Sequence, residues 1–303
     1  MTVDIPGVRA RRPHSTTPGR ATILKVRRAP TLFLILALAL YSLLASSGHA
    51  QESTPKLRGK LTVSGAATLF PLVNDIALRY EHLYPGVRID VRSVGSGNGV
   101  ADVRSGAADI GMLSRALLNN ERDLFSYPVA RDGVAVVVHR DNPVKGVTTQ
   151  QLGALLTGQL TNWKTLTGRD APVNVAWRRG HGSFELMLER LNLRREQIVG
   201  HVLTGPTEDG IKFAAADTNG LTLASVGESE RSMRSGVPIK LLAYNGVPAS
   251  IRTIQAHDYA LSRPLTLITR QLPQGLQKQF IDYALSKDVI DLQVKHGFVP
   301  YQE

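Results

Sequence analysis

The chain has 303 residues, no cysteine and a formal net charge of +11, from 36 Lys and Arg against 25 Asp and Glu. A chain of this length buries an adequate core without disulfides, and the lack of cysteine excludes a lipid anchor attached behind a signal peptide. The basic residues are spread along the chain with few aromatic residues between them, which is not typical of nucleic-acid binding. A mildly basic surface favours the approach of an anion.

Residues 1–50 are predicted to be a cleaved secretory signal peptide. The first 30 residues hold seven Lys and Arg and one acid, Asp4, so this segment carries +6 of the net charge and residues 51–303 keep +5. An apolar run from Thr31 to Leu44 follows, and small residues stand at −3 and −1 of a cut after Ala50. The run is short for a mature membrane anchor, which is the alternative. The predicted destination is the periplasm.

A flexible lead is expected at residues 51–59, and three strands joined by two helices follow it. The strands are expected at 60–64, 87–94 and 109–114, the first helix after the N-cap Thr68, and the second near 100–103. The order strand, helix, strand, helix, strand indicates βαβ units and a parallel sheet.

A second αβ region follows the apolar, β-branched stretch at 129–139. Thr148 and Gln151 have the spacing of a capping box, which predicts a helix that Gly158 ends. Further strands are expected at 173–177, 220–226, 239–243 and 264–269, with helices after the N-cap Ser183 and at 276–285. The prediction is an α/β fold of two lobes, with mixed or parallel sheets, helices on both faces and a ligand cleft between the lobes. A single larger domain is the alternative.

Three turns share one design, in which small residues stand between a short apolar strand and the start of an amphipathic helix. They are Val-Ser-Gly-Ala-Ala-Thr at 63–68, Gly-Ser-Gly-Asn-Gly at 95–99 and Gly-His-Gly-Ser at 180–183. A helix N-terminus offers unpaired N–H groups and a partial positive charge. With Arg178 and Arg179 beside the last turn, the three turns predict a site for a small oxyanion such as phosphate.

The chain resembles the phosphate-binding proteins of ABC-type phosphate transporters. The segments that carry the resemblance are SGAATLFP at 64–71, GSGNG at 95–99, ADIGMLSR at 108–115, RDGVAVVV at 131–138, GQLTNW at 158–163 and FIDYALS…HGFVP within 280–300. The resemblance implies a type II-like periplasmic-binding-protein fold, with one lobe from 60–138 plus 250–303 and the other from 139–249. It also implies a protein that binds its ligand without catalysis and presents it to a membrane permease.

The resemblance also transfers a ligand-binding role to residues in and beside the three turns. They are Ala67, Thr68, Ser96, Gly97, Ser114, Arg115, Arg178, Arg179, His181, Gly182 and Ser183.

Each of these assignments has an alternative. Either Arg178 or Arg179 takes the place of the family's arginine, although Trp177 stands at the usual spacing. Arg115 could instead pair with an acid, and His181 replaces a serine. Selecting hydrogen phosphate over sulfate needs an acceptor for its proton, and the Ser114 hydroxyl can accept.

The predicted function is therefore a monomeric periplasmic protein that captures an oxyanion, with phosphate favoured, and delivers it to an ABC permease in the inner membrane. No cofactor, metal ion or nucleic-acid partner is expected. The alternative is a sensor or scaffold of the same fold, with sulfate, molybdate or no ligand. An enzyme is disfavoured because Val100 breaks the dinucleotide fingerprint, and because Ser183 and His181 on one turn are poorly placed for base-assisted attack.

Overall fold

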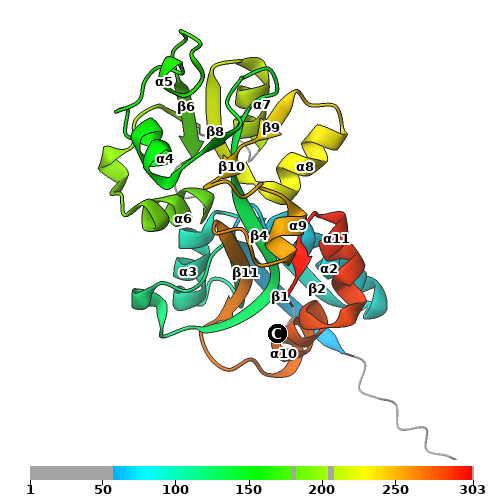
Figure 1. Cartoon of the computed structure of the whole chain (residues 1–303). Coiled ribbons are helices and arrows are strands. Elements are labelled where there is room, and N and C mark those ends of the chain that lie inside the picture. The colour runs from blue at the N-terminus through cyan, green and yellow to red at the C-terminus, as the bar shows by residue number, and fades with distance from the viewer. Residues whose placement is uncertain (1–56, 179–181, 204–207, 302–303) are drawn as a thin grey trace, which may run out of the picture. The chain divides into compact units, whose positions relative to one another are not determined.

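The computed structural model describes residues 57–178, 182–203 and 208–301 (Figure 1). The predicted signal peptide and most of the expected lead lie outside these ranges. Strand β1 (Arg58–Gly65) starts two residues before the expected Lys60, so the end of that lead belongs to the sheet. Within the described ranges, no helix has both the length and the apolar character needed to cross a bilayer.

The first region has the predicted order of strands and helices. It consists of β1, α2 (Phe70–Leu83), β2 (Gly86–Ser93), α3 (Ser96–Ser105) and β3 (Ile110–Leu113), and β1 pairs in parallel with both β2 and β3. Helix α3 is longer than expected. The change of chain direction before the helix occurs at the N-cap Gly95 alone, which has a φ of 91°. Gly97 and Gly99 therefore lie within the first turn of the helix.

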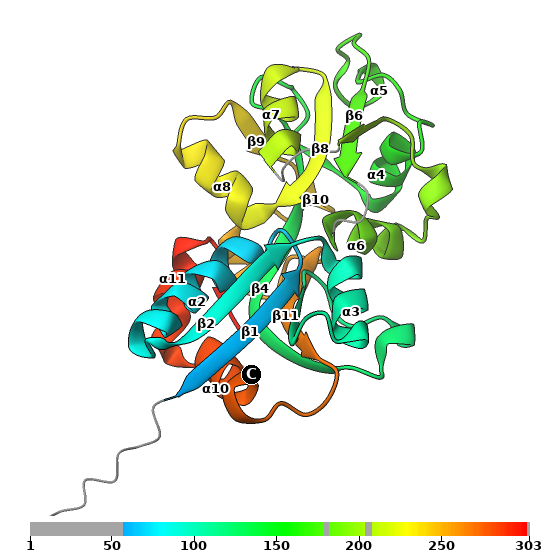
Figure 2. The ribbon, with the colours of Figure 1, turned by 180° about the vertical axis from the view of Figure 1, so that it is seen from behind.

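Helices cover both faces of this sheet, as predicted. Met112 of β3 and Leu267 of β11 (Ser262–Thr269) share a buried cluster with residues of α2 and α10 (Gly275–Leu285). The next residue of each strand points the other way, because side chains alternate across a strand. Leu113 and Ile268 accordingly pack with Val100 and Val103 of α3. Figure 2 shows α2 and α3 on opposite sides of β1.

Strand β4 (Phe125–His139) joins the two regions. Its first part pairs antiparallel with β11 and β12 (Val299–Pro300), and its second part pairs antiparallel with β8 (Gly220–Ser225) and β9 (Ile239–Leu241). The main strand order is β2-β1-β3-β11-β4-β8-β6-β7, with parallel pairing at both ends and antiparallel pairing around β4. The sheet is therefore mixed, as expected.

The second region has more helices than the sequence predicted. The capping box of Thr148 and Gln151 is confirmed at the start of α4, whereas α7 and α8 were not predicted. The helices are α4 (Thr149–Leu156), α5 (Lys164–Thr167), α6 (Gly182–Leu191), α7 (Glu208–Ala216), α8 (Val226–Arg234), α9 (Ile251–Gln255) and, later, α11 (Ile290–Lys295). The strands are β5 (Gly146–Val147), β6 (Asn174–Arg178), β7 (His201–Leu203) and β10 (Ala243–Tyr244), and short 3-10 turns lie at Asn119–Glu121, Arg195–Gln197 and Lys287–Val289.

Two predicted N-caps are wrong. The N-cap of α2 is Leu69 rather than Thr68, and the Ala66 carbonyl accepts from the N–H groups of Leu69 and Phe70. The Ala66 carbonyl thus accepts hydrogen bonds at the start of the helix, where the Thr68 hydroxyl was expected to accept them. Ser183 lies inside the first turn of α6, because that helix begins at Gly182.

Two buried apolar clusters form the cores of two lobes. The first-lobe cluster draws on residues 61–130 and 265–298, and the second-lobe cluster draws on residues 134–261 and Val299. Along β4, Val129 and Ala130 belong to the first-lobe cluster, and the residues from Val134 to Val138 belong to the second-lobe cluster. The lobe boundaries expected near residues 138 and 250 stay a prediction.

A fully buried ion pair lies on β4 between these two clusters. Arg263 Nη2 of β11 donates to Asp132 Oδ2 of β4 at 2.9 Å, and neither side chain has solvent exposure. The other carboxylate oxygen of Asp132 accepts from the hydroxyl of Ser225, the N-cap of α8, at 2.9 Å. Arg263 Nε and Nη1 have no partner among the described residues, so the guanidinium charge depends on Asp132.

Asp132→Ala should lower the free energy of unfolding by about 3–5 kcal/mol, because it leaves the buried Arg263 charge uncompensated. Urea unfolding followed by circular dichroism measures the loss. The double variant Asp132→Ala/Arg263→Met should regain most of it, while Asp123→Ala, which breaks an exposed pair with Arg104, should leave the unfolding midpoint unchanged. An Asp132→Ala midpoint equal to that of Asp123→Ala would contradict this account.

Candidate functional site

The first and second turns lie against each other in the first lobe. A Cβ on Gly99 would lie 2.7 Å from the Gly65 Cα and 2.8 Å from the Ser64 carbonyl oxygen, so the close approach requires glycine. Thr68, three residues after Gly65, is buried. Among the described residues, the backbone N–H groups of Ala67 and Thr68 enter no hydrogen bond with another backbone group. The first turn therefore offers donors from its loop rather than from the start of α2.

The start of α3 meets the end of β3 through two buried serines. Ser96 is the first residue of α3, and its Oγ accepts from the Ser114 N–H at 3.4 Å. Ser96 is 2% exposed and Ser114 is 1% exposed. Gly97 is exposed, and nothing lies within 4 Å of a Cβ placed on it. The second turn thus leaves open space beside the N–H groups at the start of α3.

The third turn reaches the first lobe through Gly182. A Cβ on Gly182 would overlap the Ser114 Oγ and lie 3.0 Å from the Ser114 carbonyl oxygen. Ser183, the next residue of α6, is also buried. The N-terminal ends of α3 and α6 therefore meet at Ser114, although they belong to different lobes.

Arg178 ends β6, at the other side of the turn that leads to Gly182. Trp177 is buried and stacks on Phe184 of α6, with ring centroids 4.2 Å apart and planes at 11°. Because neighbours on a strand face opposite ways, Arg178 points away from that packing. Its Nη1 is buried and has no partner among the described residues, and burial lowers the pKa of its guanidinium. We call Ser96, Ser114, Arg178 and Gly182 the interlobe site.

Three carboxylates of the second lobe act on the charge of Arg178. Glu208 and Asp209 begin α7, and Glu228 lies in the first turn of α8. Their charges oppose the effect of burial on the pKa of Arg178. Burial, and after it the neighbouring charge of Glu208, raises the pKa of Glu228 to about 7. Arg178 thus feels the charge of three carboxylates, while its Nη1 has no hydrogen-bond partner among the described residues.

Arg115 forms an ion pair with an acidic residue, which is the alternative to the ligand-binding role predicted from the family resemblance. Its guanidinium binds Glu121 with two hydrogen bonds, of 2.6 and 2.8 Å, and both side chains are buried. Burial by itself would raise the pKa of Glu121, but the bonds from Arg115 and the Leu118 N–H lower it. Arg115 also donates to the Ala116 carbonyl at 2.9 Å. Arg179 and His181, which the sequence also proposed, lie outside the described residues.

Glu228, whose charge acts on Arg178, is not among the site residues predicted from the sequence. Ser225 and Glu228 have the S-x-x-E spacing of a capping box directly after a strand, and that signal predicts the start of α8. Ser225 does cap the helix by accepting from the Glu228 N–H at 3.3 Å. The proximity of Glu228 to Arg178, 50 residues earlier in the chain, arises from the pairing of β6 with β8.

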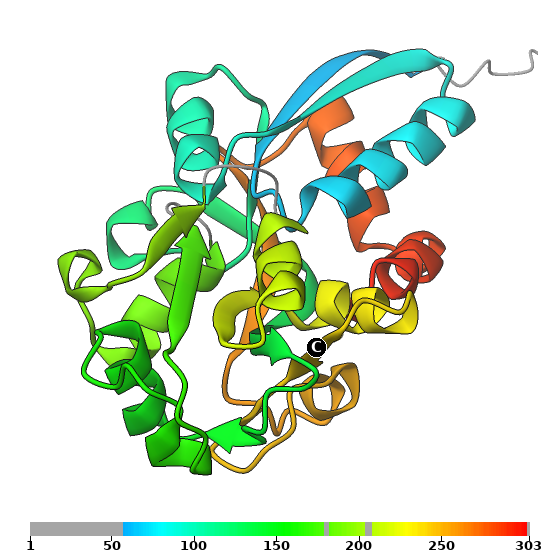
Figure 3. The ribbon, with the colours of Figure 1, turned by 90° about the horizontal axis from the view of Figure 1, so that it is seen from above.

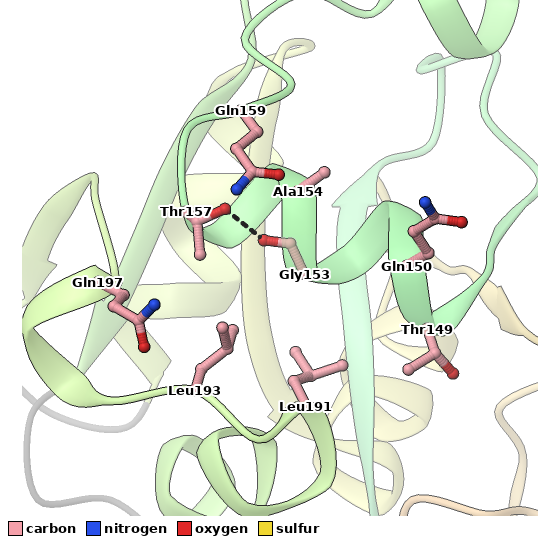
Figure 4. A pocket seen from close by; sticks show the side chains of 9 residues that line it. All are labelled: Thr149, Gln150, Gly153, Ala154, Thr157, Gln159, Leu191, Leu193 and Gln197. Carbon is pink, nitrogen blue, oxygen red and sulfur yellow. Dashed lines mark hydrogen bonds between the residues drawn. The ribbon is translucent and has the colours of Figure 1, made fainter.

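A separate pocket of about 460 Å³ lies on the second lobe beside α4 and the end of α6 (Figure 4). Its lining contains three glutamines and two threonines but no charged residue; the lining residues are Thr149, Gln150, Gly153, Ala154, Thr157, Gln159, Leu191, Leu193 and Gln197. This lining offers no counter-charge to an anion, whereas the interlobe site contains the guanidinium of Arg178.

Comparison with known proteins agrees with the resemblance. The family model of the PBP superfamily domain matches residues 50–288. The phosphate-binding protein PstS of Bacillus subtilis is 26% identical over 285 residues, which cover 89% of this chain and 93% of that protein.

Two solved structures have the same fold. A putative phosphate ABC transporter substrate-binding protein with bound phosphate from Clostridium perfringens is 26% identical, with a TM-score of 0.73 over 80% of this chain and all of that one. An ABC-type phosphate transport receptor from Vibrio cholerae is also 26% identical, with a TM-score of 0.68 over the same shares. These matches confirm the two-lobed α/β fold. The chain therefore belongs to the PBP superfamily, and its relatives there are phosphate-binding proteins of ABC transporters.

Proposed function

We propose that this protein captures inorganic phosphate, or a closely related oxyanion, between its two lobes and delivers it to an ABC permease. The observation that carries the proposal is the meeting of two helix N-termini at Ser114. The strand that precedes α6 ends at Arg178, whose buried Nη1 has no partner among the described residues. A desolvated oxyanion needs donors for most of its oxygens, and the ends of α3 and α6, the serine hydroxyls and the guanidinium supply them.

The proposed contacts come from both lobes. Ala67 and Thr68 donate from the first turn, and Ser96, Gly97 and Ser114 donate from the second turn and the end of β3. Gly182, Ser183 and Arg178 complete the site from the second lobe. Arg115, held by Glu121, supports the loop after Ser114 rather than the anion itself. The role of Arg179 and His181 follows from the family resemblance alone.

We further propose that the protein acts as a monomer in the periplasm after removal of residues 1–50, and that it binds without catalysis. The basic, apolar and small-residue order of the N-terminal segment supports export. The names of the relatives, which are phosphate-binding and phosphate transport proteins, support binding without catalysis. The competing proposal is a sensor or scaffold with a weakened site. Isothermal titration calorimetry with phosphate, sulfate and molybdate decides between them, because a scaffold without a ligand gives no binding heat at millimolar concentrations.

Arg178→Gln should weaken phosphate binding by roughly 10–100-fold, because the variant loses a charge-assisted hydrogen bond in a desolvated site. Calorimetry measures the dissociation constant. Arg169→Gln is the matched control, since Arg169 is an exposed arginine of the second lobe, and it should bind phosphate as the wild type does. Equal phosphate affinity of the two variants would rule out Arg178 as a ligand.

Gly182→Ala should weaken phosphate binding by at least about tenfold. The added methyl group would overlap the Ser114 Oγ and hold the two helix N-termini apart. Gly153→Ala serves as the control, because a Cβ at this glycine of α4 meets nothing within 4 Å. The control should bind normally and unfold at an equal or slightly higher temperature. Unchanged phosphate binding by Gly182→Ala would show that the contact with Ser114 does not matter.

A further inference from the structure

Asp102 of α3 forms a short hydrogen bond with the first turn. The Ser64 hydroxyl donates to Asp102 Oδ2 at 2.5 Å, across 38 residues of the chain. Ser64 is the next-to-last residue of β1, and it is only 1% exposed. A buried hydroxyl needs a partner in the protein, and within the described ranges Asp102 is the acceptor for this one. The bond therefore joins α3 to the end of the strand that leads into the first turn.

The same helix touches the first turn at a second point, one helical turn earlier. A Cβ on Gly99 would lie 2.8 Å from the Ser64 carbonyl oxygen. Residues three apart in a helix lie on one face, so Gly99 and Asp102 both approach the end of β1. A close backbone contact and a hydrogen bond together fix the distance and the rotation of α3. Figure 3 shows β1, in blue, between α2 and α3 when the molecule is seen from above.

Asp102 also holds the connection between α3 and β3. Its backbone carbonyl accepts from the Ala108 N–H at 3.2 Å and from the Ser105 hydroxyl at 3.1 Å. Strand β3 begins two residues after Ala108 and ends directly before Ser114. Asp102 thus contacts the first turn through its side chain, and through its backbone it contacts the segment that leads to Ser114.

Surface charge does not account for Asp102. Asp90 of β2, for comparison, forms an ion pair with Arg92 in which both side chains are 56% exposed. Within the described ranges Asp102 forms no ion pair, and its carboxylate instead accepts from the buried Ser64 hydroxyl. The contact is therefore best explained by the position that it gives to the two segments.

We propose that Asp102 is a positioning residue of the oxyanion site, which acts through Ser64 to hold the first turn in register with the start of α3. This inference rests on the proposed function, in which both segments donate to one oxyanion. Donors from two segments bind a small ligand well only if the spacing between the segments is fixed before the ligand arrives. Asp102 itself does not need to touch the anion.

The test measures phosphate dissociation constants of variants at the Ser64–Asp102 pair by titration calorimetry. Asp102→Ala and Ser64→Ala each remove the bond and should each weaken phosphate binding by about five- to tenfold. The double variant should bind no more weakly than either single variant, because all three lack the same bond. If Asp102→Ala does not fold, Ser64→Ala supplies the comparison, since it removes a single hydroxyl group.

Two control variants separate the hydrogen bond from the charge. Asp102→Asn loses the charge but keeps an acceptor oxygen for the Ser64 hydroxyl, so it should bind phosphate as the wild type does. Asp90→Ala removes an acid of the same lobe whose ion pair is exposed, and it should also keep the wild-type affinity. Thermal unfolding of every variant shows that the protein is folded at the temperature of the titration.

The outcomes separate this inference from the function on which it rests. A purely structural role of Asp102 would lower the unfolding temperature and leave the phosphate affinity of the folded protein unchanged, which would overturn the inference while the proposed function stands. Equal weakening by Asp102→Asn and Asp102→Ala would trace the effect to the charge, and that result also overturns it. If the wild type binds neither phosphate nor sulfate nor molybdate, both proposals fail.

Discussion

A fully buried ion pair between Arg263 and Asp132 lies where the two lobes join, and each of its charges depends on the other. The two residues lie opposite each other on β11 and β4, where the apolar core of the first lobe gives way to that of the second. A buried charge pair is a weak source of net stability, but breaking it is costly because the remaining charge cannot be solvated. Through Ser225, the pair also fixes the start of α8. One polar network thus ties the strand that joins the lobes to the helix that carries Glu228.

The proposed site uses helix N-termini selectively. The sequence pattern predicts free N–H donors at all three helix starts. In α2, however, the N–H groups of Leu69 and Phe70 donate to the Ala66 carbonyl, and Pro71 has no N–H. At the start of α3 the Gly95 N–H donates to the Gly65 carbonyl, but the N–H groups of Ser96 and Gly97 have no backbone acceptor among the described residues. The first residues of α3 and α6 meet at Ser114. An anion there would be held by one helix from each lobe, so its binding would couple directly to the approach of the lobes.

The sequence predicted correctly those helices and strands that are determined by residues close together in the chain. The capping box of Thr148 and Gln151, the βαβ order of the first region and the apolar face of α10 are of this kind. The sequence could not predict contacts fixed by strand pairing, such as Arg263 with Asp132 at a separation of 131 residues. The same limit applies to Glu228, whose box spacing was visible while its approach to Arg178 was not. The choice between ion pair and ligand for Arg115 also required the position of Glu121.

The central claim is that an oxyanion binds where the N-termini of α3 and α6 meet beside Arg178. A crystal structure of the protein grown with phosphate tests it most directly. The account predicts one phosphate within about 3 Å of the Ser96 hydroxyl, the Gly182 N–H and a guanidinium nitrogen of Arg178. Phosphate bound elsewhere, with the Ser114 to Gly182 contact unchanged and Arg178 turned to solvent, would contradict it.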